Sequence, residues 1–111
     1  MILHTDGSSI GNTGPSGFGA VLRNHEGVWI EGISGNLGNA DNSLAEVVAI
    51  LEGLNLAVAR RFTTLTCYSD SQEALRLIQR ASVVNQKIPL PISWLGEEPR
   101  KKRSLRLGLF P

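Results

Sequence analysis

Residues 6–22, DGSSIGNTGPSGFGAVL, decide how this chain folds, because a carboxylate, a glycine-rich segment and an alternating apolar run follow one another there. A glycine-rich loop binds phosphate when it follows a strand and opens a helix, whose N-terminus holds the anion. Here the glycines instead lead into residues 18–22, whose alternating hydropathy predicts a strand. The sequence contains no Gly-Lys-Ser/Thr motif either. We therefore interpret the glycine-rich segment as a turn between two strands, and we do not favour a nucleotide-binding function.

The composition limits the classes of protein to which this chain can belong. Its 111 residues are 41% hydrophobic and 5% aromatic, which suits one modest domain with an aliphatic core. We expect no apolar segment long enough to span a membrane, and the N-terminus lacks the basic and apolar regions of a signal peptide. Cys67 is the only cysteine, which excludes an internal disulfide and a cysteine metal cluster. The net charge of +1 says little about partners, and an intracellular location is expected.

Hydropathy periods and turn residues predict the elements that surround the opening stretch. Strands are expected at residues 2–6, 18–24, 28–34 and 64–69, and residues 35–39 are expected to form a loop. Helices are expected at about 43–60, capped by Asn42 or Ser43, and at about 70–80. This order predicts a mixed α/β sheet. We place the domain at residues 1–80 and expect 81–111, which hold four prolines and a basic run at 100–103, to be a poorly ordered basic tail.

The predicted topology brings three carboxylates from distant parts of the sequence together. Short connections make the first three strands antiparallel neighbours, and a right-handed crossover through the long helix makes the fourth strand parallel to the first. If the fourth strand docks beside the first, their carboxyl ends meet, which places Asp6 and Asp70 at the same edge. The long helix begins at that edge, and Glu46 lies in its first turn on a face of small residues.

Several carboxylates at one place need a positively charged partner, because burying unpaired charge is costly. Mg²⁺ binds one or two carboxylates together with water and phosphate oxygens, so the cluster predicts a divalent metal site. Each carboxylate also has a simpler explanation. Asp6 before Gly7 suits an Asx turn, and Glu46 and Asp70 suit helix caps, the first with Ser43 and the second with Glu73.

A set of motifs occurs in one order along the chain: DGS at 6–8, GNTGPSGFGAVL at 11–22, AE at 45–46, AILEGLNLA at 49–57 and SDS at 69–71. Together they resemble the ribonuclease H fold, and most of all the plant ribonuclease H-like domains related to reverse-transcriptase-associated modules. The resemblance covers about residues 2–79. It implies a nuclease with a two-metal site for Mg²⁺ or Mn²⁺ that cuts the RNA strand of an RNA–DNA hybrid. Its catalytic and metal-binding carboxylates match Asp6, Glu46 and Asp70.

The resemblance also implies a nucleic-acid partner, either an RNA–DNA hybrid or double-stranded RNA. Such a partner would be recognised by its 2′-hydroxyls and helix shape rather than by base sequence. By the same resemblance, the residues near the substrate would be Gly11, Asn12 and Gln72.

The chain departs from the family pattern after residue 80. The family normally adds a fifth strand and a C-terminal helix with a fourth carboxylate, and often a nearby histidine. Here the acids after Asp70 are only Glu73, Glu97 and Glu98, and both histidines, His4 and His25, come earlier. We therefore expect the last strand and helix to be missing, as in a truncated version of a longer domain, and the strand at 64–69 to be an exposed edge.

This departure leaves two alternatives to the enzyme open. One is a nucleic-acid-binding module without catalysis, which would use Arg60, Arg61 and the basic run at 100–103. The other is a fragment that does not fold stably by itself.

Overall fold

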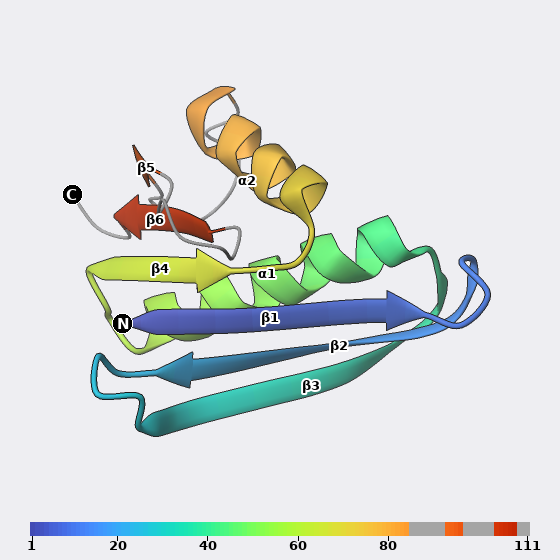
Figure 1. Ribbon diagram of the computed structural model, residues 1–111, viewed down its shortest axis with the longest axis horizontal. Coiled ribbons are helices and arrows are strands. Elements are labelled where there is room, and N and C mark those ends of the chain that lie inside the picture. Colours follow the sequence, from blue (N-terminus) through green and yellow to red (C-terminus); the bar gives the residue numbers. More distant parts are fainter. Residues whose placement is uncertain (85–92, 97–103, 109–111) are drawn as a thin grey trace.

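The computed structural model describes the backbone of residues 1–84, 93–96 and 104–108, and the side chains of residues 1–80. Its elements are β1 (Ile2–Ser9), β2 (Gly14–Arg23), β3 (Trp29–Ala40), α1 (Asn42–Ala59), β4 (Thr64–Tyr68), α2 (Gln72–Val84), β5 (Ser93–Gly96) and β6 (Ser104–Gly108). The strands form one sheet in the order β3-β2-β1-β4-β6-β5. In Figure 1, α1 runs behind the sheet and α2 lies above it.

The pairing of the strands confirms the predicted topology. β1 and β2 are antiparallel, and Asp6 lies opposite Gly19 in their register. β2 and β3 are also antiparallel. After the α1 crossover, β4 pairs with β1 in parallel, and the last pair joins His4 to Tyr68. The fold is therefore a mixed α/β sheet with β1 at its centre.

The first three strands are longer than the sequence predicted. β1 continues past Asp6 to Ser9, β2 begins at Gly14, and β3 runs through the predicted loop at 35–39. Glycine and asparagine have low strand propensity, but cross-strand pairing overrides that preference. At Gly35 the ring of Phe18 fills the space of the absent side chain, since an added Cβ would lie 2.4 Å from a ring carbon.

One face of α1 packs against β1 and β2, as the helical period predicted. Its polar residues Glu52 and Asn55 are exposed on the other side. Buried side chains of the sheet lie across the interface, among them Leu3, Leu22 and Cys67. Burial raises the pKa of the Cys67 thiol to about 12. The buried residues of the helix are Ala45, Ala49, Ile50, Gly53, Leu54 and Ala57.

The expectation that no segment is apolar enough for a membrane span was wrong for α1. Its 18 residues have a mean hydropathy of 1.4, which meets the length and composition of a membrane-crossing helix. In this fold the apolar residues of α1 form the interface with the sheet, so the core accounts for its hydropathy.

The ends of both helices differ from the predicted ones. Asp41, rather than Asn42 or Ser43, caps α1, because its carboxylate accepts a hydrogen bond of 2.7 Å from the Leu44 N–H. The Ser71 hydroxyl oxygen accepts from the Ala74 N–H at 3.1 Å and caps α2, which continues to Val84.

The expectation that β4 is an exposed edge was also wrong. β6 pairs with β4 in antiparallel orientation, and β5 pairs with β6. The short alternating run SLRLG at 104–108 forms this strand, although its length made it a weak signal in the sequence. No further helix follows α2 in the described segments 93–96 and 104–108. The basic run at 100–103 lies outside the described residues, and a domain boundary near residue 80 stays a prediction.

Candidate active site

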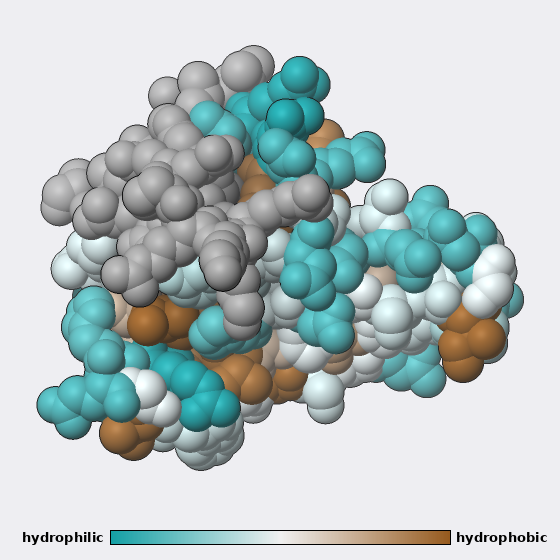
Figure 2. All heavy atoms as spheres, viewed as in Figure 1, coloured by the Kyte–Doolittle hydropathy of each residue, from teal (hydrophilic) through white to brown (hydrophobic). Residues whose placement is uncertain are grey.

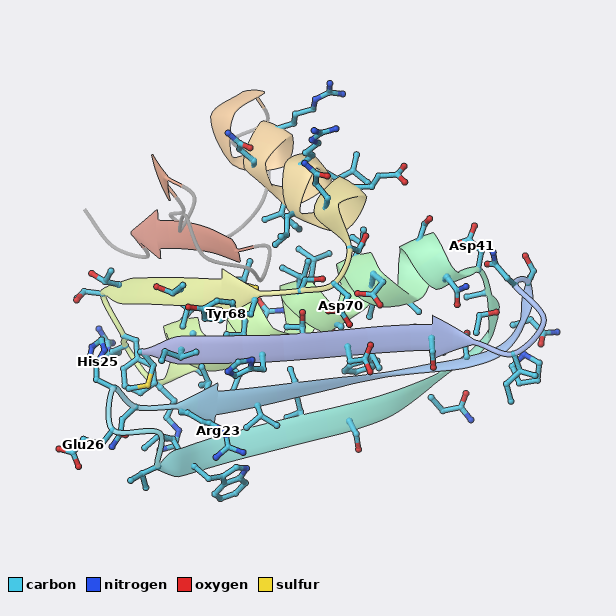
Figure 3. The ribbon with its side chains drawn as sticks, viewed as in Figure 1. Arg23, His25, Glu26, Asp41, Tyr68 and Asp70 are labelled. Atoms are coloured by element: carbon cyan, nitrogen blue, oxygen red, sulfur yellow. The ribbon has the colours of Figure 1, made fainter. Side chains whose placement is uncertain are left out.

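The candidate site lies where β1 and β4 stop pairing. Their last pair is His4 with Tyr68, after which β1 continues to Ser9 and β4 ends. Asp6 therefore lies just beyond the paired region on β1, and Asp70 lies just beyond it after β4. Both aspartates are exposed. In Figure 3, Asp70 lies beyond the carboxyl end of β4, while Asp41 marks the start of α1.

The Glu46 carboxylate reaches this site from α1 and has a hydrogen-bond donor on each oxygen. The Gly7 N–H donates to Oε1 at 3.3 Å, and the Ser69 hydroxyl donates to Oε2 at 3.2 Å. Gly7 follows Asp6 and Ser69 precedes Asp70, so these two bonds tie Glu46 to the chain beside each aspartate. The pairing of β1 with β4 ends before Gly7, so the Gly7 N–H bonds to Glu46 instead of to β4.

The simpler explanations for the three carboxylates do not hold in this structure. Asp6 lies within β1 rather than in a turn. Glu46 is the fifth residue of α1, beyond its first turn, and bonds to Gly7 and Ser69 instead of closing a capping box with Ser43. Asp70 does not cap α2, since Ser71 does.

The three carboxylates are close enough for their charges to interact. Burial raises the pKa of the Glu46 carboxyl above its usual range, and the negative charges of Asp6 and Asp70 raise it further. The hydrogen bonds from Gly7 and Ser69 act in the opposite direction. The structure thus brings Asp6, Glu46 and Asp70 together, as the topology predicted.

This pKa shift predicts how stability depends on pH. Because the pKa of Glu46 is higher in the folded state than its ordinary value of 4.5, ionisation of Glu46 costs stability as the pH rises through the folded-state pKa. Glu46→Gln removes that charge and keeps a group that can bond to Gly7 and Ser69. Without divalent metal, we expect the Tm of Glu46→Gln to exceed that of the wild type by about 1–4 °C at pH 7 and to converge with it near pH 4.

Thermal melts followed by circular dichroism at both pH values would measure this difference. Glu52→Gln, on the exposed face of the same helix, is the matched control and should follow the wild-type profile. A lower Tm for Glu46→Gln at pH 7 would contradict the prediction.

Gly7 makes this arrangement possible, a role that sequence reasoning missed. A Cβ at Gly7 would lie 2.3 Å from the carbonyl carbon and oxygen of Ala45 and 2.7 Å from the Glu46 nitrogen. Only glycine lets β1 approach the backbone of α1 so closely. The signal was present in the DGS motif, but a close approach between distant segments cannot be detected from one sequence.

The carboxylate oxygens at this site are chemically suited to bind a hard divalent cation. Carboxylate and water oxygens are the ligands of Mg²⁺, which usually keeps several waters and takes only one or two carboxylates directly. Among residues 1–80, whose side chains the structure describes, no three His, Cys, Asp or Glu residues are close enough to hold one ion directly. A divalent ion at this site would therefore need water among its ligands.

The predicted substrate-binding residues lie in two places. Gly11 and Asn12 form the turn between β1 and β2 with φ of 82° and 34°, and this turn lies beside the start of α1 in Figure 1. The Asn12 side-chain oxygen accepts from the Asn42 N–H at 2.8 Å, and the Asn42 side-chain oxygen accepts from the Ser9 N–H at 2.7 Å. Gln72 is the exposed first residue of α2, two positions after Asp70.

A shallow groove runs from Asp6 across the face of the sheet that is opposite α1. His4 belongs to this face and stacks on Tyr68 with ring centroids 5.2 Å apart. Figure 2 shows that the hydrophobic residues on this view are scattered in small groups rather than gathered in one patch. Residues that line the groove include His4, Asp6, Gly19, Val21, Trp29 and Ser34.

No fourth carboxylate joins the three in the part of the chain whose side chains the structure describes. Glu73 is exposed on α2. It does not contribute to the raised pKa of Glu46, which has only Asp6 and Asp70 as charged causes. Glu97 and Glu98 lie outside the described residues.

Comparison with known proteins assigns the family. A family model described as reverse transcriptase-like matches residues 4–94. The chain belongs to this family of ribonuclease H-like domains. A ribonuclease H of Oleidesulfovibrio alaskensis is 35% identical over 111 residues, covering 98% of this chain and 68% of the relative. A protein of Arabidopsis thaliana whose name describes it as a ribonuclease H protein is 34% identical over 70 residues, covering 63% of this chain and 11% of the relative.

Solved structures of ribonucleases H share the fold of this ribonuclease H-like domain. RNase H1 of Halobacterium salinarum has a TM-score of 0.62 and 29% identity, covering 74% of this chain and 59% of its own. LC11-RNase H1, solved in complex with an RNA/DNA hybrid, has a TM-score of 0.60 and 28% identity, covering 72% of this chain and 58% of its own. The chain thus spans less than two thirds of the length of these solved relatives.

Proposed function

We propose that this domain hydrolyses the RNA strand of RNA–DNA hybrids in a reaction that depends on Mg²⁺ or Mn²⁺. The observation that carries the proposal is the Glu46 carboxylate held between the neighbours of Asp6 and Asp70. The family membership and the hybrid bound by LC11-RNase H1 support the choice of substrate. Two metal ions, as the resemblance implies, stay a prediction.

The two exposed aspartates and the partly buried Glu46 have different parts in the proposed reaction. Asp6 and Asp70 are exposed and can reach a phosphodiester and its metal, whereas Glu46 is partly buried and held in place. A bound divalent metal would neutralise charge at the scissile phosphate and would lower the pKa of an attacking water. Burial and, to a smaller extent, the charges of Asp6 and Asp70 raise the pKa of Glu46, which supports a need for positive charge at the site.

We propose that the substrate contacts the turn between β1 and β2 and the start of α2, through Gly11, Asn12 and Gln72. The Asn12–Asn42 hydrogen bond ties the turn to α1 and restrains its backbone. An ordered turn loses less entropy on binding than a mobile one.

A second candidate, a binding module without catalysis, is favoured by the lack of a fourth carboxylate among the described side chains. The structure weakens another part of its support, the proposed use of Arg60 and Arg61 for nucleic-acid binding. Arg60 pairs with Glu31, and it lies about 21 Å along α1 from Glu46, at a rise of about 1.5 Å per residue. Arg60 and Arg61 therefore lie at the opposite end of α1 from the carboxylates.

Incubation of the purified chain with a hybrid labelled on its RNA strand tests both candidates. We expect RNA cleavage with Mg²⁺ or Mn²⁺ and none with a chelator, and no cleavage of matched double-stranded DNA. Salt-dependent hybrid binding without cleavage under either metal would support the binding module instead. A broad, non-cooperative thermal melt would favour the unstable fragment.

A further inference from the structure

We propose that Ser69 is a positioning residue whose single hydroxyl orients both Glu46 and Asp70. The inference rests on the proposed function, because it concerns the carboxylates of that same site. Ser69 connects β4 to α2 and makes hydrogen bonds in both directions from one oxygen.

The direction of these bonds is determined by the chemistry of a hydroxyl. The Ser71 N–H donates to the Ser69 oxygen at 3.1 Å, and a backbone amide can only donate. The hydroxyl has one proton of its own, which it donates to Oε2 of Glu46 at 3.2 Å. The bond from Ser71 therefore helps to aim the proton of Ser69 at the carboxylate.

The same two bonds also constrain Asp70. Asp70 is the middle residue of the turn that the Ser71 N–H closes onto the Ser69 oxygen. This turn depends on the Ser71 N–H, whereas the Ser71 hydroxyl accepts from Ala74 and caps α2 separately. The Ser69 hydroxyl thus joins the turn that carries one carboxylate to the side chain of another.

Burial prevents water from taking over this role easily. Ser69 is only 5% exposed, so removal of its hydroxyl leaves little room for a replacement donor. Oε2 of Glu46 would lose its donor while the charges of Asp6 and Asp70 continue to repel it. Glu46 would then keep only the Gly7 N–H and could turn away from the aspartates.

Ser69→Ala is the direct test, with Mn²⁺ affinity measured by calorimetry as a readout independent of turnover. We expect Mn²⁺ affinity and kcat on the hybrid each to fall about 10–100-fold, with KM nearly unchanged. Ser69→Thr restores the hydroxyl and should recover most of both losses. Ser71→Ala is the matched control, because it removes the cap of α2 but keeps the Ser69–Glu46 bond. It should lower Tm without weakening Mn²⁺ binding.

The outcomes separate this inference from the proposed function. A wild-type chain that neither binds Mn²⁺ nor cleaves the hybrid would overturn both. A wild-type chain that does both, with Ser69→Ala equal to it, would overturn this inference alone. If Ser69→Thr does not fold, equal Mn²⁺ affinities for Ser69→Ala and Ser71→Ala would overturn it just as well.

Discussion

Replacing Asp6 by asparagine is expected to slow hybrid cleavage by about 10³-fold or more, equivalent to roughly 4 kcal/mol of activation free energy. Asparagine has nearly the same shape but no charge, so it binds a divalent cation much more weakly. Asp6 is exposed and makes its strand contacts through the backbone, so the fold should remain. Without metal, the Tm should stay equal or rise, because one charge that repels Glu46 is gone.

Asp41→Asn provides the matched control for this variant. Asp41 is also an exposed aspartate, and asparagine caps a helix about as well as aspartate does. Single-turnover cleavage of a labelled hybrid, with circular dichroism to check folding, gives both rates. Equal activity of folded Asp6→Asn and wild type would show that Asp6 does not take part in the reaction.

Replacing Gly7 by alanine is expected to destabilise the protein by about 2–4 kcal/mol, a fall in Tm on the order of 10–25 °C. The added methyl group would lie 2.3 Å from the carbonyl of Ala45, which is backbone and cannot rotate away. β1 and α1 must therefore separate, and Glu46 moves with α1. We expect Mn²⁺ binding to be lost together with stability, because the Gly7–Glu46 hydrogen bond depends on this approach.

Gly19→Ala distinguishes a clash from a general effect of alanine at glycine positions. Gly19 lies opposite Asp6 on β2, where an added Cβ would meet nothing closer than 3.9 Å. Its Tm should stay within a few degrees of the wild type. Chemical denaturation of both variants measures the difference, and a Gly7→Ala variant as stable as Gly19→Ala would refute the close-approach argument.

Prediction from the sequence succeeded where the signal was local or topological. The helical period identified the face of α1 that packs on the sheet, since burial repeats with the turn of the helix. Chain-crossover rules made β4 parallel to β1, and the assumed docking of β4 beside β1, which the structure confirms, brings Asp6 and Asp70 together. Prediction failed at residues 35–39, where the pairing of β3 with β2 outweighs the low strand propensity of glycine and asparagine. It also failed at 104–108, a strand too short to produce a clear period.

The sequence alone therefore determined the family motifs, the order of elements and the choice of Asp6, Glu46 and Asp70 as candidate ligands. Only the tertiary structure decided why Glu46 belongs to that site. Its carboxylate is held by the Gly7 N–H and the Ser69 hydroxyl, which come from segments 62 residues apart and flank the two aspartates. No local pattern records such contacts, because the approach of β1 to α1 and the end of β4 at Tyr68 arise only when the chain has packed.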